Sequence, residues 1–256
     1  MSEPLINENL HTKQYAFSST LDIRYVGPDT TTQRLPTILF FATSAERSLT
    51  EAAFLPFINQ CLATPSRIFS ITLPYHDIYN PNKAMQIWQK KAKSDEDILT
   101  PFIHEVDQFV NHLESISKTE SIAISGLSRG GLIALLLARK RSAATKLVLF
   151  APLLLGSTSS PEQQDSLTSK LSPFSYLHDL IHHPICSFIG NLDTRVHTVE
   201  CARFHNELAK EAQKQRAHPL HFSLTIAPSI GRDGHGTCNK SFIRGADWIL
   251  NKEIIT

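Results

Sequence analysis

A serine flanked by glycines is the clearest reactive feature of this sequence. Residues 126–131 read GLSRGG, which places Ser128 at the centre of a Gly-x-Ser-x-Gly pattern. A strand-like segment, 121–125, precedes the pattern, and an apolar helical segment, 131–139, follows it. A sharp strand-to-helix turn exposes such a serine, and N–H groups at the start of the helix can stabilise an oxyanion. The pattern predicts that Ser128 is a nucleophile; the alternative is an ordinary serine in a glycine-rich turn.

The base that this serine requires is predicted to be His235. A serine hydroxyl is a poor nucleophile at neutral pH, and an imidazole can take its proton. The sequence has 12 histidines, so position must distinguish them. His235 lies in a GHG stretch between the last predicted strand, 220–226, and the last predicted helix, 240–251. Its flanking glycines let the loop bring the ring to the sheet edge. The alternative is a solvent-facing loop histidine.

An acid should orient the imidazole and stabilise its protonated form. Asp193 directly follows the predicted strand 184–189 and is the first candidate. Asp165, which comes after the preceding predicted strand, is the alternative. Asp233 lies too close to His235 in the sequence to be a convincing orienting group.

Strand-like and helix-like segments alternate through most of the chain, and they must position these three residues. We expect an opening hairpin at 15–25, strands at 37–42, 67–73, 121–125, 146–155, 184–189 and 220–226, and helices at 48–62, 98–113, 131–139, 199–213 and 240–251. Ser48 and Glu51 have the spacing of a capping box for the first of these helices. The alternation predicts a mostly parallel sheet with helices on both faces. Ligands of such sheets bind outside the carboxyl ends of the strands, so reactive residues should follow strands directly.

The order of elements and the GLSRGG turn resemble the α/β-hydrolase superfamily over residues 15–253. Within it, this turn and the LPYHD stretch at 73–77 resemble the branch of dienelactone hydrolases, prolyl oligopeptidases and small esterases. The resemblance implies the α/β-hydrolase fold without a large lid domain. It also implies a catalytic triad of Ser128, Asp193 and His235, which follow one another in the chain order expected of this fold.

The oxyanion hole needs two N–H donors. One should be the backbone N–H of Arg129, the residue after the nucleophile, and the second should come from the loop after the strand 37–42. The chain reads FATS there and lacks the HGG run of many lipases and esterases. The choice between Ala42 and Thr43 stays open, and we favour Thr43. The Arg129 side chain could pair with a substrate carboxylate or buttress the fold, and we favour the second.

Three further side chains are expected at the rim of the site. Tyr75 and His76 follow the predicted strand 67–73, and Trp88 lies in the polar stretch after them. All three could contact substrate; the alternative is that they are ordinary loop anchors. Neither 77–96 nor 156–183 is long enough for a large lid domain.

Composition fits one globular domain over residues 1–256. Hydrophobic residues make up 41% and charged residues 19% of the chain, and the formal net charge is +1, so no global field attracts nucleic acid. The four cysteines are scattered, no histidine pair has metal-ligand spacing, and no signal peptide or membrane span is visible. We therefore expect a cytoplasmic protein with no metal, no cofactor and no nucleic-acid partner. Its oligomeric state stays open.

These features together predict a carboxylesterase-like serine hydrolase that acts on a small-molecule acyl substrate. Ser128 attacks the carbonyl, His235 transfers the proton, and Asp193 holds His235 while an acyl-enzyme forms and is hydrolysed. Thioesters and amides would pass through the same steps. The alternatives are a short-peptide serine peptidase and a binding protein that keeps the fold without turnover.

Overall fold

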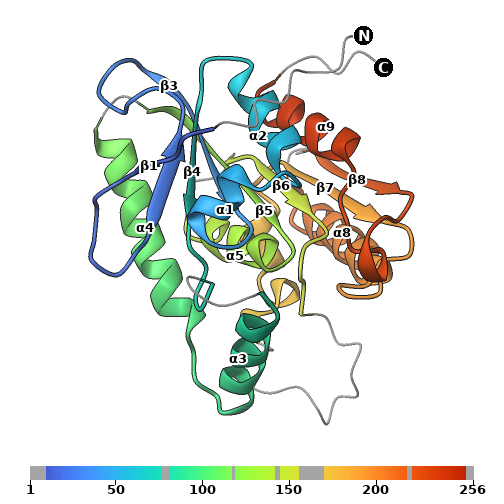
Figure 1. Cartoon of the computed structure of the whole chain (residues 1–256). Coiled ribbons are helices and arrows are strands. Elements are labelled where there is room, and N and C mark those ends of the chain that lie inside the picture. The colour runs from blue at the N-terminus through green and yellow to red at the C-terminus, as the bar shows by residue number, and fades with distance from the viewer. Residues whose placement is uncertain are drawn as a thin grey trace.

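The computed structural model describes residues 10–76, 81–116, 119–141, 145–155, 170–217 and 221–251. Within these ranges the strands form one sheet in the order β1-β2-β4-β3-β5-β6-β7-β8 (Figure 1). Their bounds are β1 Lys13–Gln14, β2 Ile23–Val26, β3 Leu35–Phe41, β4 Arg67–Ile71, β5 Thr119–Leu127, β6 Leu147–Phe150, β7 Ile185–Gly190 and β8 Phe222–Ala227. The β1–β2 and β2–β4 pairs are antiparallel, and every other pair is parallel. The predicted, mostly parallel sheet is confirmed.

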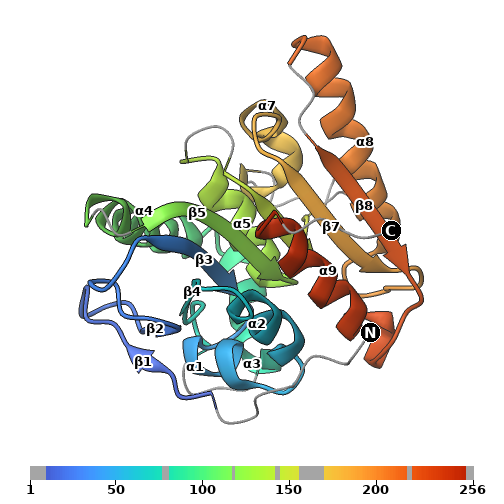
Figure 2. The ribbon, with the colours of Figure 1, turned by 90° about the horizontal axis from the view of Figure 1, so that it is seen from above.

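Helices cover both faces of this sheet. Their bounds are α1 Ala45–Thr50, α2 Leu55–Leu62, α3 Pro81–Lys93, α4 Leu99–Ser115, α5 Arg129–Ala138, α7 Leu177–Leu180, α8 Thr198–Lys214 and α9 Asn239–Ile249, with short 3-10 turns η2 Pro173–Ser175 and η3 Arg232–Gly234. Figure 2 shows α2 and α9 on one side of the sheet and α4, α5 and α8 on the other. None of the helices described is long and apolar enough to cross a membrane.

The hydrophobic core is divided by the sheet into two layers. Strand β6 shows how: Leu147 and Leu149 join the layer beneath α4, α5 and α8, whereas Val148 and Phe150 join the layer beneath α2 and α9. Alternate side chains of a strand point to opposite faces, so a strand that packs on both sides is apolar at every position. This explains why continuous apolar runs in the sequence mark the central strands.

The predicted helix over 48–62 is wrong in detail, because the structure divides it into α1 and α2. The hydroxyl of Ser44, not that of Ser48, caps α1 by accepting the backbone N–H of Arg47 at 3.4 Å. Glu51 then has extended backbone angles and ends α1. Pro56 lies in the first turn of α2, where its missing N–H costs no intrahelical hydrogen bond.

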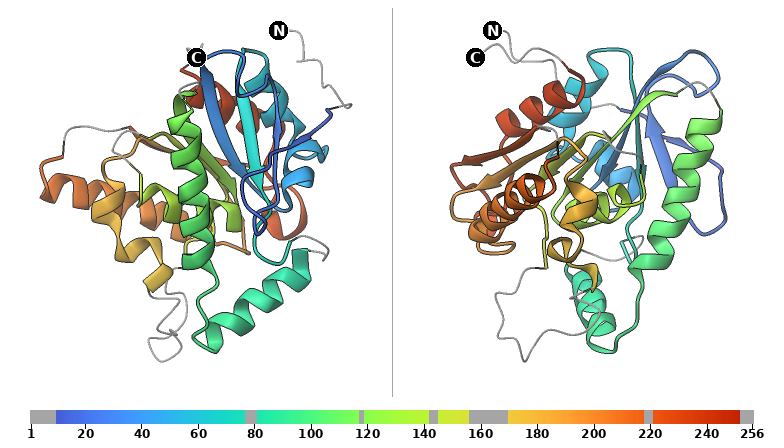
Figure 3. Two further views of the ribbon diagram at one scale, coloured as in Figure 1. Left: turned by 90° about the vertical axis from the view of Figure 1, so that its left-hand side faces the viewer. Right: turned by 180° about the vertical axis from the view of Figure 1, so that it is seen from behind.

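Helix α3 was not expected from the sequence. It occupies the polar stretch after β4 and ends in a basic turn. In the views of Figures 1 and 3 it lies at one end of the molecule, apart from the helices that cover the two faces of the sheet. Among the described helices, α3 covers a cavity rather than a face of the sheet.

Candidate active site

Ser128 lies at a strained turn between β5 and α5. Its backbone angles are φ 54° and ψ −115°, a combination that non-glycine residues rarely adopt and that is typical of a nucleophile elbow. The turn needs glycines on both sides. A Cβ atom on Gly126 would lie 2.1 Å from the carbonyl oxygen of Gly130, and one on Gly130 would lie 1.8 Å from that of Phe41. The Gly-x-Ser-x-Gly pattern therefore has a steric cause in this fold.

The His235 ring bridges the serine and an aspartate. Its Nε2 lies 2.9 Å from Ser128 Oγ, and its Nδ1 lies 2.7 Å from Asp193 Oδ2. A carboxylate only accepts hydrogen bonds, so in the neutral ring Nδ1 carries the proton and Nε2 is left to accept the serine hydroxyl proton. This is the tautomer that a general base needs. The three predicted residues come together although they are up to 107 positions apart in the sequence.

Asp193 is fixed by its own loop after β7. Its Oδ1 accepts the backbone N–H groups of Arg195 (2.9 Å) and Val196 (3.1 Å), which leaves Oδ2 for the histidine. Its side chain is fully buried. Burial alone would raise the pKa of this carboxyl, but the hydrogen bonds from His235 and the two backbone N–H groups lower it below its ordinary value. Asp193 is thus held as the carboxylate that orients an imidazole.

Thr198 contributes to this loop, and sequence reasoning missed it. Its hydroxyl donates to the carbonyl of Gly190 at 2.6 Å and accepts the backbone N–H of Asp193 at 3.1 Å. The acid loop is therefore tied to the end of β7. The available signal was a threonine at the start of a predicted helix, where hydroxyls commonly bond nearby backbone groups. The alternative acid, Asp165, lies outside the described residues.

The two predicted oxyanion donors have different surroundings. Arg129 is the first residue of α5, so its backbone N–H stands at the positive end of the helix. The N–H of Thr43 donates to Ser48 Oγ at 3.0 Å, and that hydroxyl in turn donates to the carbonyl of Ser44. In this arrangement the N–H of Thr43 is engaged within its own loop. The choice between Ala42 and Thr43 stays a prediction.

The Arg129 side chain packs inside the protein, as expected for a buttress. Its guanidinium carbon lies 5.8 Å from the centre of the Trp88 ring, and the residue is 6% exposed. Burial, together with the positive charge of Arg195, lowers the pKa of the Arg129 guanidinium to about 10. The group stays charged at neutral pH.

The residues expected at the rim are placed in three different ways. Trp88 is buried and borders a cavity beneath α3. His76 is buried as well; its Nδ1 and the indole N–H of Trp88 each donate to the carbonyl of Pro74 at 2.9 Å. Tyr75 is half-buried and lines a separate groove beside residues 18–22. A role in substrate contact stays a prediction for all three.

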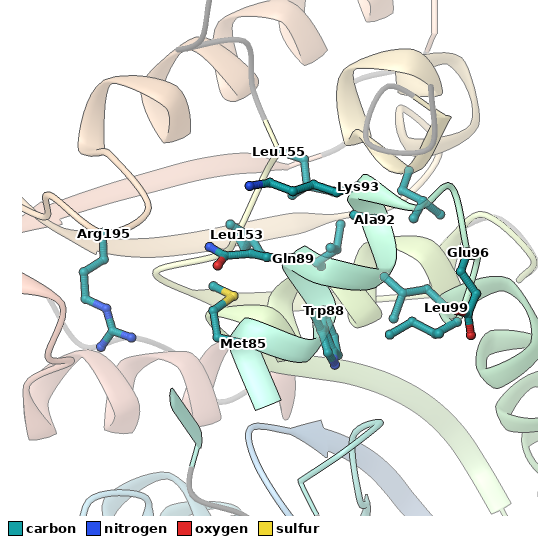
Figure 4. A pocket seen from close by; sticks show the side chains of 13 residues that line it. Met85, Trp88, Gln89, Ala92, Lys93, Glu96, Leu99, Leu153, Leu155 and Arg195 are labelled. Carbon is teal, nitrogen blue, oxygen red and sulfur yellow. The ribbon is translucent and has the colours of Figure 1, made fainter. Parts of the chain in front are cut away.

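The cavity beneath α3 has a volume of about 440 Å³. Figure 4 shows Met85, Trp88, Gln89 and Ala92 on α3, with Leu153, Leu155 and Arg195 among the other residues that line it. Volumes of this size suit small-molecule ligands. Among the described residues no cluster of His, Cys, Asp and Glu could hold a metal ion, and all four cysteines are free.

The sequence matches one protein family. A model of the dienelactone hydrolase family matches residues 48–220, which is more than half of the chain. No curated protein matches the sequence.

Three solved structures illustrate the likeness in fold. The acylaminoacyl peptidase of Pyrococcus horikoshii is 14% identical with a TM-score of 0.63; the match covers 94% of this chain but only 41% of that one. Est1E from Butyrivibrio proteoclasticus is 12% identical with a TM-score of 0.64, over 94% of this chain and 98% of its own. An esterase of Thermogutta terrifontis, solved with butyrate bound, is 16% identical with a TM-score of 0.56, over 96% and 95%. The expected α/β-hydrolase fold is confirmed.

Proposed function

Because this chain belongs to the dienelactone hydrolase family, we propose that it is a serine hydrolase that cleaves a carboxylic ester bond. The observation that carries the proposal is the continuous hydrogen-bond chain from Ser128 Oγ through the His235 ring to Asp193 Oδ2. A nucleophile, a base and an orienting acid in this arrangement are recognised by their geometry on many folds. The substrate is accordingly a small molecule with an acyl group.

The reaction proceeds in two halves. Ser128 Oγ attacks the carbonyl carbon while His235 Nε2 takes its proton, and Asp193 stabilises the imidazolium that forms. The tetrahedral intermediate then collapses: the bond to the alcohol breaks, and the alcohol leaves with the proton from Nε2. An ester now links the acyl group to Ser128. Water attacks that ester with His235 again as base, which releases the acid and restores the serine.

The oxyanion of each tetrahedral intermediate requires N–H donors placed before the reaction begins. We assign one to the backbone of Arg129 and the second to Thr43 or Ala42. For Thr43 to serve, its N–H must exchange the Ser48 hydroxyl for the oxyanion. Ser48 would then be a placeholder that keeps this donor satisfied while the site is empty.

Hydrolysis of p-nitrophenyl esters tests the proposal. Wild-type protein should hydrolyse at least one member of an acetate-to-decanoate series, and Ser128→Ala should reduce kcat by at least about 10⁴-fold. Ser94→Ala is a matched control, since Ser94 is exposed and its hydroxyl bonds only the end of α3. A short-peptide p-nitroanilide series run in parallel distinguishes an esterase from a peptidase. If wild-type protein hydrolyses neither series, or if Ser128→Ala retains wild-type turnover, the proposal is wrong.

A further inference from the structure

The cavity beneath α3 borders the immediate neighbours of the catalytic residues. Leu132, one turn along α5 from Ser128, lines it. Leu153 also lines it, and the N–H of Leu153 donates to the carbonyl of Ser128 at 2.9 Å. Arg195, whose N–H bonds Asp193, forms part of the opposite wall. Ser128, Asp193 and His235 do not themselves line the cavity, but residues bonded to Ser128 and Asp193 form part of its wall.

The walls of the cavity are apolar, and the polar side chains stand at its mouth. Leucines from four parts of the chain form most of the floor: Leu99, Leu132, Leu153, Leu155 and Leu171. The polar lining residues are all exposed: Gln89, Lys93, Glu96 and Arg195. The charge of Glu96 is balanced by Lys91, whose Nζ lies 2.5 and 2.6 Å from its two carboxylate oxygens. Among the described lining residues, the leucines of the floor offer no side-chain hydrogen-bond partner, which favours an apolar occupant.

One side of helix α3 packs against the protein, and the cavity separates its other side from the leucines of the floor. Ala84 and Trp88 face the protein interior, and the Trp88 indole N–H is bonded to Pro74. Met85, Gln89 and Ala92 face the cavity (Figure 4). Protein interiors are close-packed, and leucines that line an open space lose dispersion contacts and remain in contact with water. Leu153 and Leu155 are left only half-buried. An apolar ligand group would restore these contacts.

We propose that this cavity binds the apolar part of the ester, a straight chain of about eight to ten carbons or an aromatic group of similar size. The inference rests on the proposed function and adds the substrate class to it. The volume of about 440 Å³ equals that of roughly fifteen water molecules, each of which occupies about 30 Å³ in the liquid. Allowing for imperfect filling, this leaves room for about ten non-hydrogen atoms. An acetyl group alone would leave most of the leucine surface uncovered.

Two ester series test the size preference and identify the side of the ester bond that enters the cavity. In the first series p-nitrophenol is the fixed leaving group and the acyl chain runs from two to fourteen carbons; in the second, acetate is fixed and the alcohol is varied. We expect kcat/KM to rise by up to about fourfold for each added methylene in one series, to peak near eight to ten carbons, and to fall at fourteen. A profile that is flat or that falls from two carbons onward in both series overturns the inference.

Variants that fill the cavity test whether the chain-length preference of kcat/KM arises from this cavity. We compare kcat/KM for the eight-carbon substrate, divided by kcat/KM for the two-carbon substrate of the same series. Ala92→Trp should lower this ratio at least tenfold. Met85→Trp, on the same helix, fills the cavity from a second position and should lower the ratio as well. Lys90→Trp is the matched control, because Lys90 is exposed on α3 and does not line the cavity. Its ratio should equal that of wild type. If both filling variants fold, by circular dichroism, and keep the wild-type ratio, the inference is wrong.

Labelling by a fluorophosphonate separates this failure from that of the proposed function. Wild-type protein that is labelled at Ser128 but has no chain-length preference is a serine hydrolase without the substrate class inferred here. Protein that is neither labelled nor active on any ester contradicts the proposed function, and the inference falls with it.

Discussion

Asp193 is the residue whose surroundings constrain the proposed chemistry most closely. One of its carboxylate oxygens is used by two backbone N–H groups and the other by His235. In the proposed mechanism its role is therefore to fix the orientation and tautomer of the His235 ring rather than to exchange a proton. Two measurable quantities depend on these contacts: the turnover number kcat, and the pH dependence of the free energy of unfolding.

The first is turnover. Asp193→Asn keeps the size of the side chain but can present an N–H₂ group to Nδ1, which favours the wrong tautomer. We expect kcat for the best ester to fall by roughly 10⁴-fold. Asp233→Asn, on the half-exposed carboxylate two residues before His235, is the control and should change kcat less than about threefold. If Asp165→Asn is severely impaired and Asp193→Asn is not, the acid has been assigned to the wrong residue.

The second property is the dependence of stability on pH. The folded-state pKa of Asp193 lies below the unfolded value of about 3.9, so its carboxylate contributes full stability above that pH. As the pH falls below about 4, the unfolded chain binds the proton first and the contribution is lost. Urea denaturation at pH 7, 5, 4 and 3 should show wild type losing more free energy of unfolding than Asp193→Asn between pH 5 and 3. Equal losses would mean that the native contacts do not favour the carboxylate.

Residue patterns in the sequence predicted which three side chains meet, because each follows a strand whose carboxyl end lies at the same edge of the sheet. They could not predict the contacts that hold the loops. Thr198 bonds the acid loop only because the chain after β7 folds back on itself. The bond from the N–H of Thr43 to Ser48 likewise depends on where α1 begins. Hydrogen bonds of this kind depend on loop conformation, and residue type alone does not fix it.

The loop between β7 and α8, residues 191–197, carries Asp193 and is bonded at both ends of the turn by the Thr198 hydroxyl. Thr198→Val keeps the shape of the side chain and removes the hydroxyl that bonds Gly190 and Asp193. We expect a loss of about 1–3 kcal/mol in the free energy of unfolding and a fall in kcat of about ten- to a hundredfold, since a displaced acid misaligns the ring. Thr194→Val is the matched control on the same loop, because the Thr194 hydroxyl is exposed and bonds only the carbonyl of Asp233 at 3.2 Å. Equal effects of the two substitutions would contradict this role for Thr198.

At the turn that carries Ser128, strand β5, helix α5 and strand β3 are in close contact. Because a Cβ on Gly130 would overlap the carbonyl of Phe41 on β3, Gly130→Ala should destabilise the protein by more than about 3 kcal/mol or prevent folding. Ala134→Gly makes the reverse change of one carbon in the same helix and should cost only about 1–2 kcal/mol, from lower helix propensity and the loss of a buried methyl group. Thermal unfolding of both variants measures the difference. A stable Gly130→Ala protein would mean that α5 and β3 lie further apart than described.

Sequence periodicity predicted nearly every strand and most helices, and two of its errors have clear physical causes. The predicted helix over 48–62 contains Pro56, which a helix interior does not tolerate, so the chain forms two shorter helices. Helix α3 was missed because its segment is rich in lysine and amide side chains. The apolar stripe that could have signalled a helix is short: Ala84 and Trp88 lie four residues apart and are both buried.

In the described part of the chain, one continuous sheet carries the loops of the three candidate catalytic residues, Ser128, Asp193 and His235. We therefore propose that the chain is a single domain, as the sequence predicted for residues 1–256. Activity, far-ultraviolet circular dichroism and the fluorescence of Trp248 on α9, read in a Trp88→Phe background, should be lost at the same urea concentration. Midpoints that differ by more than experimental error would show that part of the sheet unfolds separately from the rest.

The proposed function requires that the folded protein activates Ser128 through His235. Mapping the site of a fluorophosphonate adduct by peptide mass spectrometry measures this activation. We expect one adduct on the wild-type peptide that contains Ser128 and no adduct in Ser128→Ala. Labelling should be slowed by at least about a hundredfold in His235→Ala and in urea-unfolded wild type. An adduct on another residue, or labelling of Ser128 at the same rate in folded His235→Ala as in wild type, would contradict the proposed function.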